Sequence, residues 1–122
     1  MQFTIEADAE FLRVRAWGRS SDEPPSHLCA EVLQQSERLG RRRILIELDQ
    51  KAPLSSTSQF QLVTRLRELG LTPAHSIALV HRTAEAQKAN EFINVIAENR
   101  DLPVRNFPSL EQAAAWLRSR AA

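Results

Sequence analysis

The sequence has one cysteine, three glycines and no tyrosine, and these scarcities exclude several classes of protein. A single cysteine forms neither a disulfide framework nor a cysteine-based zinc site. Cys29 falls within the apolar stripe of a predicted helix, so we expect a buried structural thiol. Gly18, Gly40 and Gly70 stand far apart, which excludes glycine-rich dinucleotide and phosphate-binding loops. We therefore expect no metal and no other cofactor.

A strong charge of either sign is also absent. The chain has 16 basic and 15 acidic residues, for a net charge of +1, and its aromatic residues are only five Phe and two Trp. Proteins that bind nucleic acid through phosphate contacts usually carry a clear basic excess, so we expect no nucleic-acid partner. No apolar run approaches the roughly 20 residues of a transmembrane helix. The first residues lack the basic and apolar regions of a secretion signal, so we expect a cytoplasmic location.

The length and composition are those of one globular domain spanning residues 1–122. Hydrophobic residues make up 43% of the chain and charged residues 25%. A domain of this length buries roughly 60–70% of its unfolded surface, which is enough for a core without disulfides. We find no internal repeat and no linker.

Alternating apolar residues predict an antiparallel hairpin at the start of the chain. Phe3 and Ile5 alternate with polar residues, and Leu12 and Val14 do the same after a polar break at residues 8–10. This period of two is typical of strands with one buried face. The short break favours a direct turn between the two strands.

Strand and helix patterns then alternate along the rest of the chain. Strands are predicted over residues 44–49, 76–80 and 103–107, and helices over residues 28–39, 60–69, 83–97 and 110–117. Helix-starting residues at 20–25 precede the first helix, and a loop spans residues 50–54. Such alternation implies parallel strands joined by right-handed crossovers. The sequence therefore predicts an α/β fold with a mixed, mostly parallel sheet of about five strands, about four helices and the order β-β-α-β-α-β-α-β-α.

A run of hydroxyl residues follows the third predicted strand and opens the second helix. The run is Ser55, Ser56, Thr57 and Ser58, and Ser56 with Gln59 fits a capping box. In a parallel sheet this position lies at the carboxyl edge, where ligands tend to bind. A helix N-terminus favours the negative charge of a phosphorylated hydroxyl. A plain helix cap is the alternative interpretation.

Carboxylates and histidines offer a second set of candidates. Glu47 and Asp49 face the same side of one predicted strand. His75 and His81 bracket the next strand and are about 20 Å apart when extended, too far for one metal ion. An enzyme that uses Glu47, Asp49 or His81 for acid–base chemistry is one hypothesis, and solvated strand ends are the other. No complete catalytic set is present, so we assign no catalytic residue and expect no enzyme.

The second half of the chain resembles a known family. The segments that carry the resemblance are Ile77-Ala78-Leu79-Val80, Ala97-Glu98-Asn99-Arg100, Leu102-Pro103-Val104-Arg105-Asn106-Phe107 and Ser109-Leu110-Glu111-Gln112-Ala113-Ala114-Ala115-Trp116-Leu117. They resemble the SpoIIAA-like family of STAS/SEC14-type small bacterial domains. Members of this family end in a short Val-Arg-x-Phe strand and a helix that closes on Ala-x-x-Trp-Leu.

The resemblance implies a STAS-like fold without a cofactor and a regulatory, non-enzymatic function. STAS domains act as anti-sigma factor antagonists and are switched by phosphorylation of a serine in an Asp-Ser-Ser-Gly sequence. Residues 49–58 correspond to that region, and Ser55-Ser56 is the Ser-Ser pair within it. Leu54 and Thr57 stand where the family has aspartate and glycine. We therefore expect a protein partner at Ser55–Ser58, with these hydroxyls as candidate phosphoacceptors.

The SEC14 side of the resemblance implies an alternative, a module that binds a small lipid-like ligand. Its apolar pocket is predicted between the helix that starts near Ser56 and the helix that starts near Ala84. The candidate lining residues are Phe60, His81, Phe92 and Ile96. A homodimer through a sheet edge or a helix face is a further hypothesis, because exposed edge strands need protection.

Overall fold

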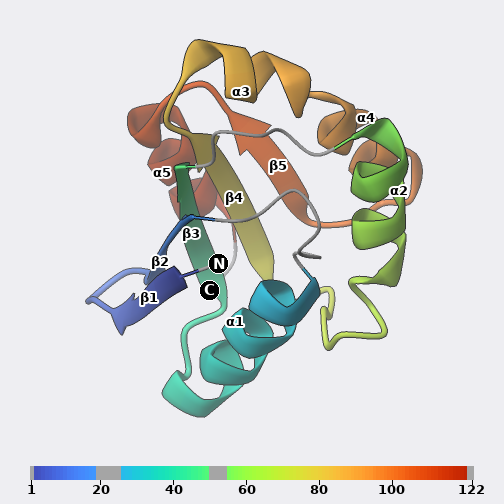
Figure 1. The fold of residues 1–122 in the computed structure, drawn as a ribbon. Coiled ribbons are helices and arrows are strands. Elements are labelled where there is room, and N and C mark those ends of the chain that lie inside the picture. The colour runs from blue at the N-terminus through green and yellow to red at the C-terminus, as the bar shows by residue number, and fades with distance from the viewer. Residues whose placement is uncertain (1, 19–25, 50–54, 121–122) are drawn as a thin grey trace.

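Five strands of the described chain form one sheet (Figure 1). The computed structural model describes residues 2–18, 26–49 and 55–120, so the predicted helix start at 20–25 and the loop at 50–54 lie outside the described residues. The strands are β1 (Gln2–Ala7), β2 (Leu12–Trp17), β3 (Arg43–Asp49), β4 (Ser76–His81) and β5 (Val104–Phe107). They lie in the order β1-β2-β3-β4-β5, with β1 antiparallel to β2 and all other neighbours parallel. The predicted α/β class and mixed, mostly parallel sheet are confirmed.

Helices cover both faces of this sheet. They are α1 (Ser26–Leu39), α2 (Ser56–Arg65), α3 (Ala84–Ala89), α4 (Phe92–Asn99) and α5 (Leu110–Ser119). Side chains of α1, α2 and α4 pack on one face, and those of α5 pack on the other. None of the helices in the described ranges combines the length and apolar character needed to cross a bilayer.

The segment predicted as one helix over residues 83–97 forms two helices, α3 and α4. They are separated at Asn90, where φ is −103° and ψ is 11°. The Asn90 side-chain amide donates a hydrogen bond to the carbonyl of Ala86 at 2.7 Å. A short polar side chain that binds a nearby carbonyl competes with the helical hydrogen-bond ladder. The observed order therefore contains one helix more than the predicted order.

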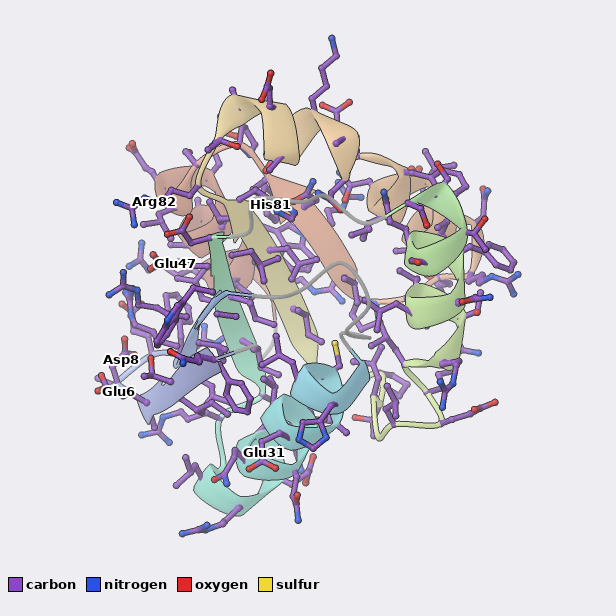
Figure 2. The ribbon with its side chains drawn as sticks, viewed as in Figure 1. Glu6, Asp8, Glu31, Glu47, His81 and Arg82 are labelled. Atoms are coloured by element: carbon purple, nitrogen blue, oxygen red, sulfur yellow. The ribbon has the colours of Figure 1, made fainter. Side chains whose placement is uncertain are left out.

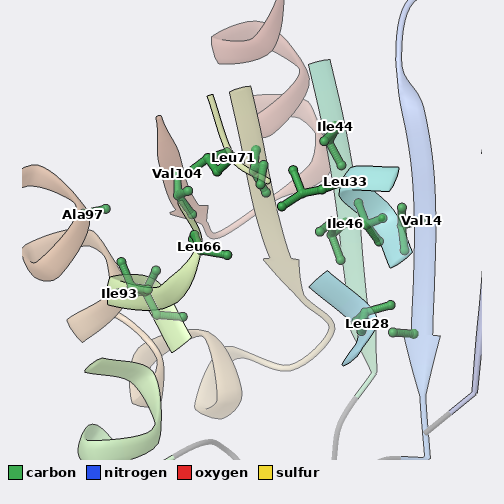
Figure 3. Close-up of a cluster of buried hydrophobic side chains, with 14 of the residues drawn as sticks. Val14, Leu28, Leu33, Ile44, Ile46, Leu66, Leu71, Ile93, Ala97 and Val104 are labelled. Atoms are coloured by element: carbon green, nitrogen blue, oxygen red, sulfur yellow. The ribbon is translucent and has the colours of Figure 1, made fainter. Parts of the chain in front are cut away.

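A large apolar core lies between the sheet and the helices α1, α2 and α4 (Figure 3). Val14 and Ile46 on the strands pack in this cluster with Leu33 of α1 and Ile93 of α4. Burial of an aliphatic side chain of this size contributes about 2 kcal/mol. The residues of β2 alternate between buried and exposed, as their sequence predicts.

A smaller core lies on the opposite face, beneath α5. Leu45 and Ala78 on the strands pack with Ala113 and Leu117 of α5. This helix contacts β3, β4 and β5. On the same face of the sheet, the side chains of β2 that alternate with its buried residues are exposed. The helix α5 therefore does not cover β2 on this face of the sheet.

Phe11 connects the hairpin to α5. Its ring is fully buried, and the guanidinium groups of Arg13, Arg43 and Arg118 lie 5.9, 5.8 and 5.6 Å from its centroid. Arg118 also binds Glu10 through two hydrogen bonds of 2.7 and 3.0 Å. Cations over an aromatic face are attracted by its quadrupole. The end of the hairpin is thereby attached to the last helix of the fold.

The side chain of Asn94 closes the outer edge of β5. Its Oδ1 accepts a hydrogen bond from the backbone N–H of Asn106 at 2.6 Å, and its Nδ2 donates to the carbonyl of Asn106 at 3.1 Å. These two bonds occupy the outward backbone groups of Asn106, which a further strand would otherwise use. Edge strands are commonly protected against pairing in such ways.

We predict that Asn94→Ala lowers the free energy of unfolding by about 2 kcal/mol, because the backbone polar groups of Asn106 lose their partners. Urea denaturation followed by circular dichroism measures the change. Asn99→Ala, an exposed change on the same helix, is the control, with an expected effect within about 0.5 kcal/mol. Equal losses in the two variants contradict this role of Asn94.

Candidate functional site

The hydroxyl run at the start of α2 is exposed at the carboxyl edge of the sheet. Ser55 is the N-cap, and its Oγ accepts a hydrogen bond from the backbone N–H of Ser58 at 3.1 Å. The capping box predicted for Ser56 and Gln59 is therefore wrong, because the helix begins one residue earlier than expected. The hydroxyls of Ser56 and Thr57 are exposed and take no part in the cap.

The residues predicted to line an apolar pocket lie in different environments. Ile96 is buried within the large core. Phe60 and Phe92 are 44% and 39% exposed, and the guanidinium of Arg100 lies 5.2 Å from the centroid of the Phe60 ring. His81 is buried at the end of β4. Phe60 lies on α2 and Phe92 on α4, two helices that pack against each other.

A pocket of about 620 Å³ opens at the carboxyl ends of β2, β3 and β4, on the face covered by α5. Its volume falls in the range of small-molecule sites. The carboxyl edge of parallel strands is also the usual place for ligands in α/β sheets. We call it the charged pocket, and its principal lining residues are Arg15, Trp17, Glu47, Asp49, Arg82 and Leu110.

The charges of this pocket are arranged in pairs. Arg15 Nε lies 4.0 Å from Glu47 Oε2, and Arg82 Nη1 lies 3.4 Å from Asp49 Oδ2. Arg15 and Glu47 are direct neighbours in the parallel register of β2 and β3. A guanidinium offers hydrogen-bond donors only, and a carboxylate offers acceptors. The pocket thus presents both donors and acceptors to a ligand, beside the indole of Trp17.

The spacing of Glu47 and Asp49 predicts one shared face, as observed, but does not identify Arg15, Trp17 and Arg82 as their neighbours. The missing information is the strand order, which sets β2 and β4 on either side of β3. The available signal was the alternation of β2, which directs Arg15 and Trp17 to the same face.

His81 lies on the opposite face of the sheet from the charged pocket. It continues the row of Ile77 and Leu79, which pack in the large core. Figure 2 shows His81 toward the α2 side of the sheet, with Glu47 and Arg82 toward the other side. Glu47, Asp49 and His81 therefore do not meet in one cleft, which the acid–base hypothesis requires.

Buried polar side chains surround the end of β4 beneath α3. Asn106 lies on the same face as His81, one strand away, and its Nδ2 donates to the carbonyl of Gln87 at 3.2 Å. Both ring nitrogens of His81, and the side-chain oxygens of Gln87, Asn90 and Asn106, have no hydrogen-bond partner within the described part of the chain. Most buried polar atoms in proteins are paired, so this group is unusual.

Burial determines the protonation of His81 and Cys29. Desolvation lowers the pKa of His81 from 6.5 to about 4, so the imidazole is neutral at pH 7. Cys29 is half-buried, less than expected from the sequence, and packs against the large core, where desolvation raises the pKa of its thiol to about 12. Across residues 2–18, 26–49 and 55–120, no three His, Cys, Asp or Glu side chains are grouped so that they could hold a metal ion.

No protein-family model, curated protein or solved structure matches this chain. The resemblance to the SpoIIAA-like family stays a prediction from sequence. Two features of the carboxyl edge, the start of α2 and the charged pocket, are the candidate functional sites.

We predict that the free energy of unfolding falls as the pH drops from about 6.5 to about 4. In this window the unfolded chain protonates His81 and the folded chain does not, so acid favours the unfolded state, by at most about 3 kcal/mol. Urea denaturation at several pH values measures the slope. In His81→Leu the slope becomes shallower, with a remainder from His75, whose pKa is also lowered by desolvation. Near pH 4 the carboxyls of Asp8 and Glu10, whose pKa values are lowered by hydrogen bonds, add to this remainder.

The exposed His27→Gln is the matched control and keeps the slope of the unmodified protein. An unchanged slope in His81→Leu contradicts the assignment of the acid sensitivity to His81.

Proposed function

We propose that this chain is a non-enzymatic, regulatory protein-interaction domain. Its partner contact is the surface formed by Ser56, Thr57 and Phe60 of α2 and by Phe92 and Val95 of α4, which we call the α2–α4 surface. The observation that carries the proposal is the exposure of large apolar side chains beside exposed hydroxyls at the start of a helix.

Apolar exposure is concentrated on the α2–α4 surface. Six large hydrophobic side chains are exposed in the described residues, and three of them are Phe60, Phe92 and Val95. Val95 is 51% exposed, and the two helices that carry these side chains pack against each other. Exposed apolar groups that gather on one surface with a polar rim are typical of protein-interaction sites.

The hydroxyl of Ser56 is well placed to control this surface. Ser56 lies one helical turn before Phe60, so the two side chains share one side of α2. Phosphorylation adds about two negative charges, which the start of a helix stabilises. The positive charge of Arg100 already lies over Phe60. A phosphate at Ser56 would therefore change the charge next to the apolar contact, in the manner that the resemblance to anti-sigma factor antagonists implies.

We predict that Ser56→Asp changes the dissociation constant for the partner at least about fivefold, because a new charge enters the rim of the interface. Phe60→Ser weakens binding by about tenfold through loss of an aromatic anchor. The partner is captured from a lysate of the source organism on the tagged chain, and the affinity of the purified pair is measured by calorimetry.

Ser119→Asp adds the same charge at the far end of α5 and serves as the control, with unchanged affinity. The interaction surface is wrong if Phe60→Ser and Phe92→Ser both bind the partner normally. The switch is wrong if Ser56→Asp and Thr57→Asp have no effect on an interaction that Phe60→Ser weakens.

The charged pocket favours a second candidate function, the binding of a small polar molecule. Its paired charges suit a ligand that carries both charge signs or several hydrogen-bonding groups, with an apolar part against Trp17 and Leu110. This chemistry differs from the lipid-like ligand expected from the sequence.

We predict that native mass spectrometry of the freshly purified chain detects a bound small molecule. Arg82→Gln loses it, because one of the pocket's guanidinium donors is removed, whereas Arg105→Gln, an exposed change on β5, retains it. A ligand-free mass, together with no thermal shift from zwitterionic or acyl compounds, contradicts this function.

A further inference from the structure

The two edges of the sheet differ in a way that points to a second copy of this chain. Asn94 occupies the outer edge of β5. At the other edge, β1 is the outermost strand and pairs with β2 alone (Figure 1). Its six residues contain no proline and no basic residue, and its register with β2 is continuous, so no bulge interrupts it. One charged side chain, that of Glu6, is present on β1, but proline, lysine and a bulge, which commonly protect an edge strand, are missing from it.

The hairpin turn identifies which backbone groups of β1 point outward. The N–H of Asp8 donates to the carbonyl of Phe11 at 3.0 Å, so these two residues form a hydrogen-bonded pair. Hydrogen-bonded and non-hydrogen-bonded pairs alternate along an antiparallel ladder. Thr4 and Glu6 therefore direct their backbone groups toward β2. Phe3, Ile5 and Ala7 direct theirs away from the sheet.

We propose that two copies of this chain pair through antiparallel β1 strands, with the two-fold axis at Ile5. In this register Ile5 faces Ile5, and Phe3 of each copy faces Ala7 of the other. All three outward residues are then matched, and each facing pair exchanges two backbone hydrogen bonds. The result is one continuous sheet built from both copies.

The side chains of β1 suit the same register. Phe3 and Ile5 are half-buried and pack against the large core. In the dimer they meet Ala7 and Ile5 of the other copy, so the apolar layer continues across the axis. On the opposite face, Thr4 lies across from Glu6, and no like charges stand directly opposite each other.

This interface is separate from the α2–α4 surface. The helix α4 contacts β5, which is the far edge of the sheet from β1. A dimer through β1 therefore leaves the proposed partner contact accessible. The dimer and the proposed function can fail independently.

The first test is the mass in solution, measured by sedimentation equilibrium at about 100 μM chain, well above a micromolar dissociation constant. The expected mass is twice the 13.8 kDa of one chain. Ala7→Pro removes an outward N–H, which an edge strand tolerates, and is expected to halve the mass. Ala7→Val keeps that N–H and is the matched control that stays dimeric. A single-chain mass for the unmodified protein, or a dimeric Ala7→Pro variant that is folded, overturns the proposal.

A cross-linking test does not depend on the proline variant. Thr4 and Glu6 of the two copies form a non-hydrogen-bonded pair, whose Cα separation suits a disulfide. An oxidised mixture of Thr4→Cys and Glu6→Cys chains is expected to form the mixed disulfide dimer as its main product. Thr4→Cys alone, whose cysteines face Glu6, is expected to stay largely uncross-linked. Predominant Thr4→Cys self-cross-linking, or no cross-link in the mixture, overturns the proposed register and pairing.

Discussion

The burial of β3 on both faces is the constraint on which the rest of the structure depends. Ile44, Leu45 and Ile46 are consecutive and all buried, so each face of this central strand must be covered. The helices α1, α2 and α4 cover one face, and α5 covers the other. Because α5 lies over β3, β4 and β5, it leaves β2 uncovered on that face of the sheet, and the β2 side chains there are exposed to solvent. The charged pocket lies at the limit of that cover, where Arg15 and Trp17 are exposed next to the first residues of α5.

Much of the fold follows from local patterns in the sequence, because each pattern reports one buried face. The alternation of β2 and the apolar run of β3 are sufficient to predict strands of two kinds, one half-exposed and one covered twice. The break between α3 and α4 was not predictable from periodicity. The spacing of apolar residues is the same before and after Asn90, so it predicts one helix. The helix α3 ends at this residue, where the Asn90 side chain donates a hydrogen bond to the carbonyl of Ala86.

The candidate site was less predictable, because its contacts join residues from separate strands. The side of β3 that carries Glu47 and Asp49 follows from spacing alone. Their pairing with Arg15 and Arg82 depends on which strands flank β3, and spacing does not contain that information. The sheet also divides the carboxyl edge into two environments. One is a neutral, buried polar region around His81, and the other is an open pocket of paired charges.

The amide of Asn94 has a consequence for how far lateral growth of the sheet can proceed. A protein whose sheet has two unprotected edge strands can add copies head to tail without limit and form fibres. Here the outer edge of β5 is already occupied by the Asn94 side chain of the same molecule. In the proposed pairing, growth proceeds from β1 only, and it stops when two such edges meet. The proposed dimer is therefore a closed particle that does not extend into a polymer through its sheet edges.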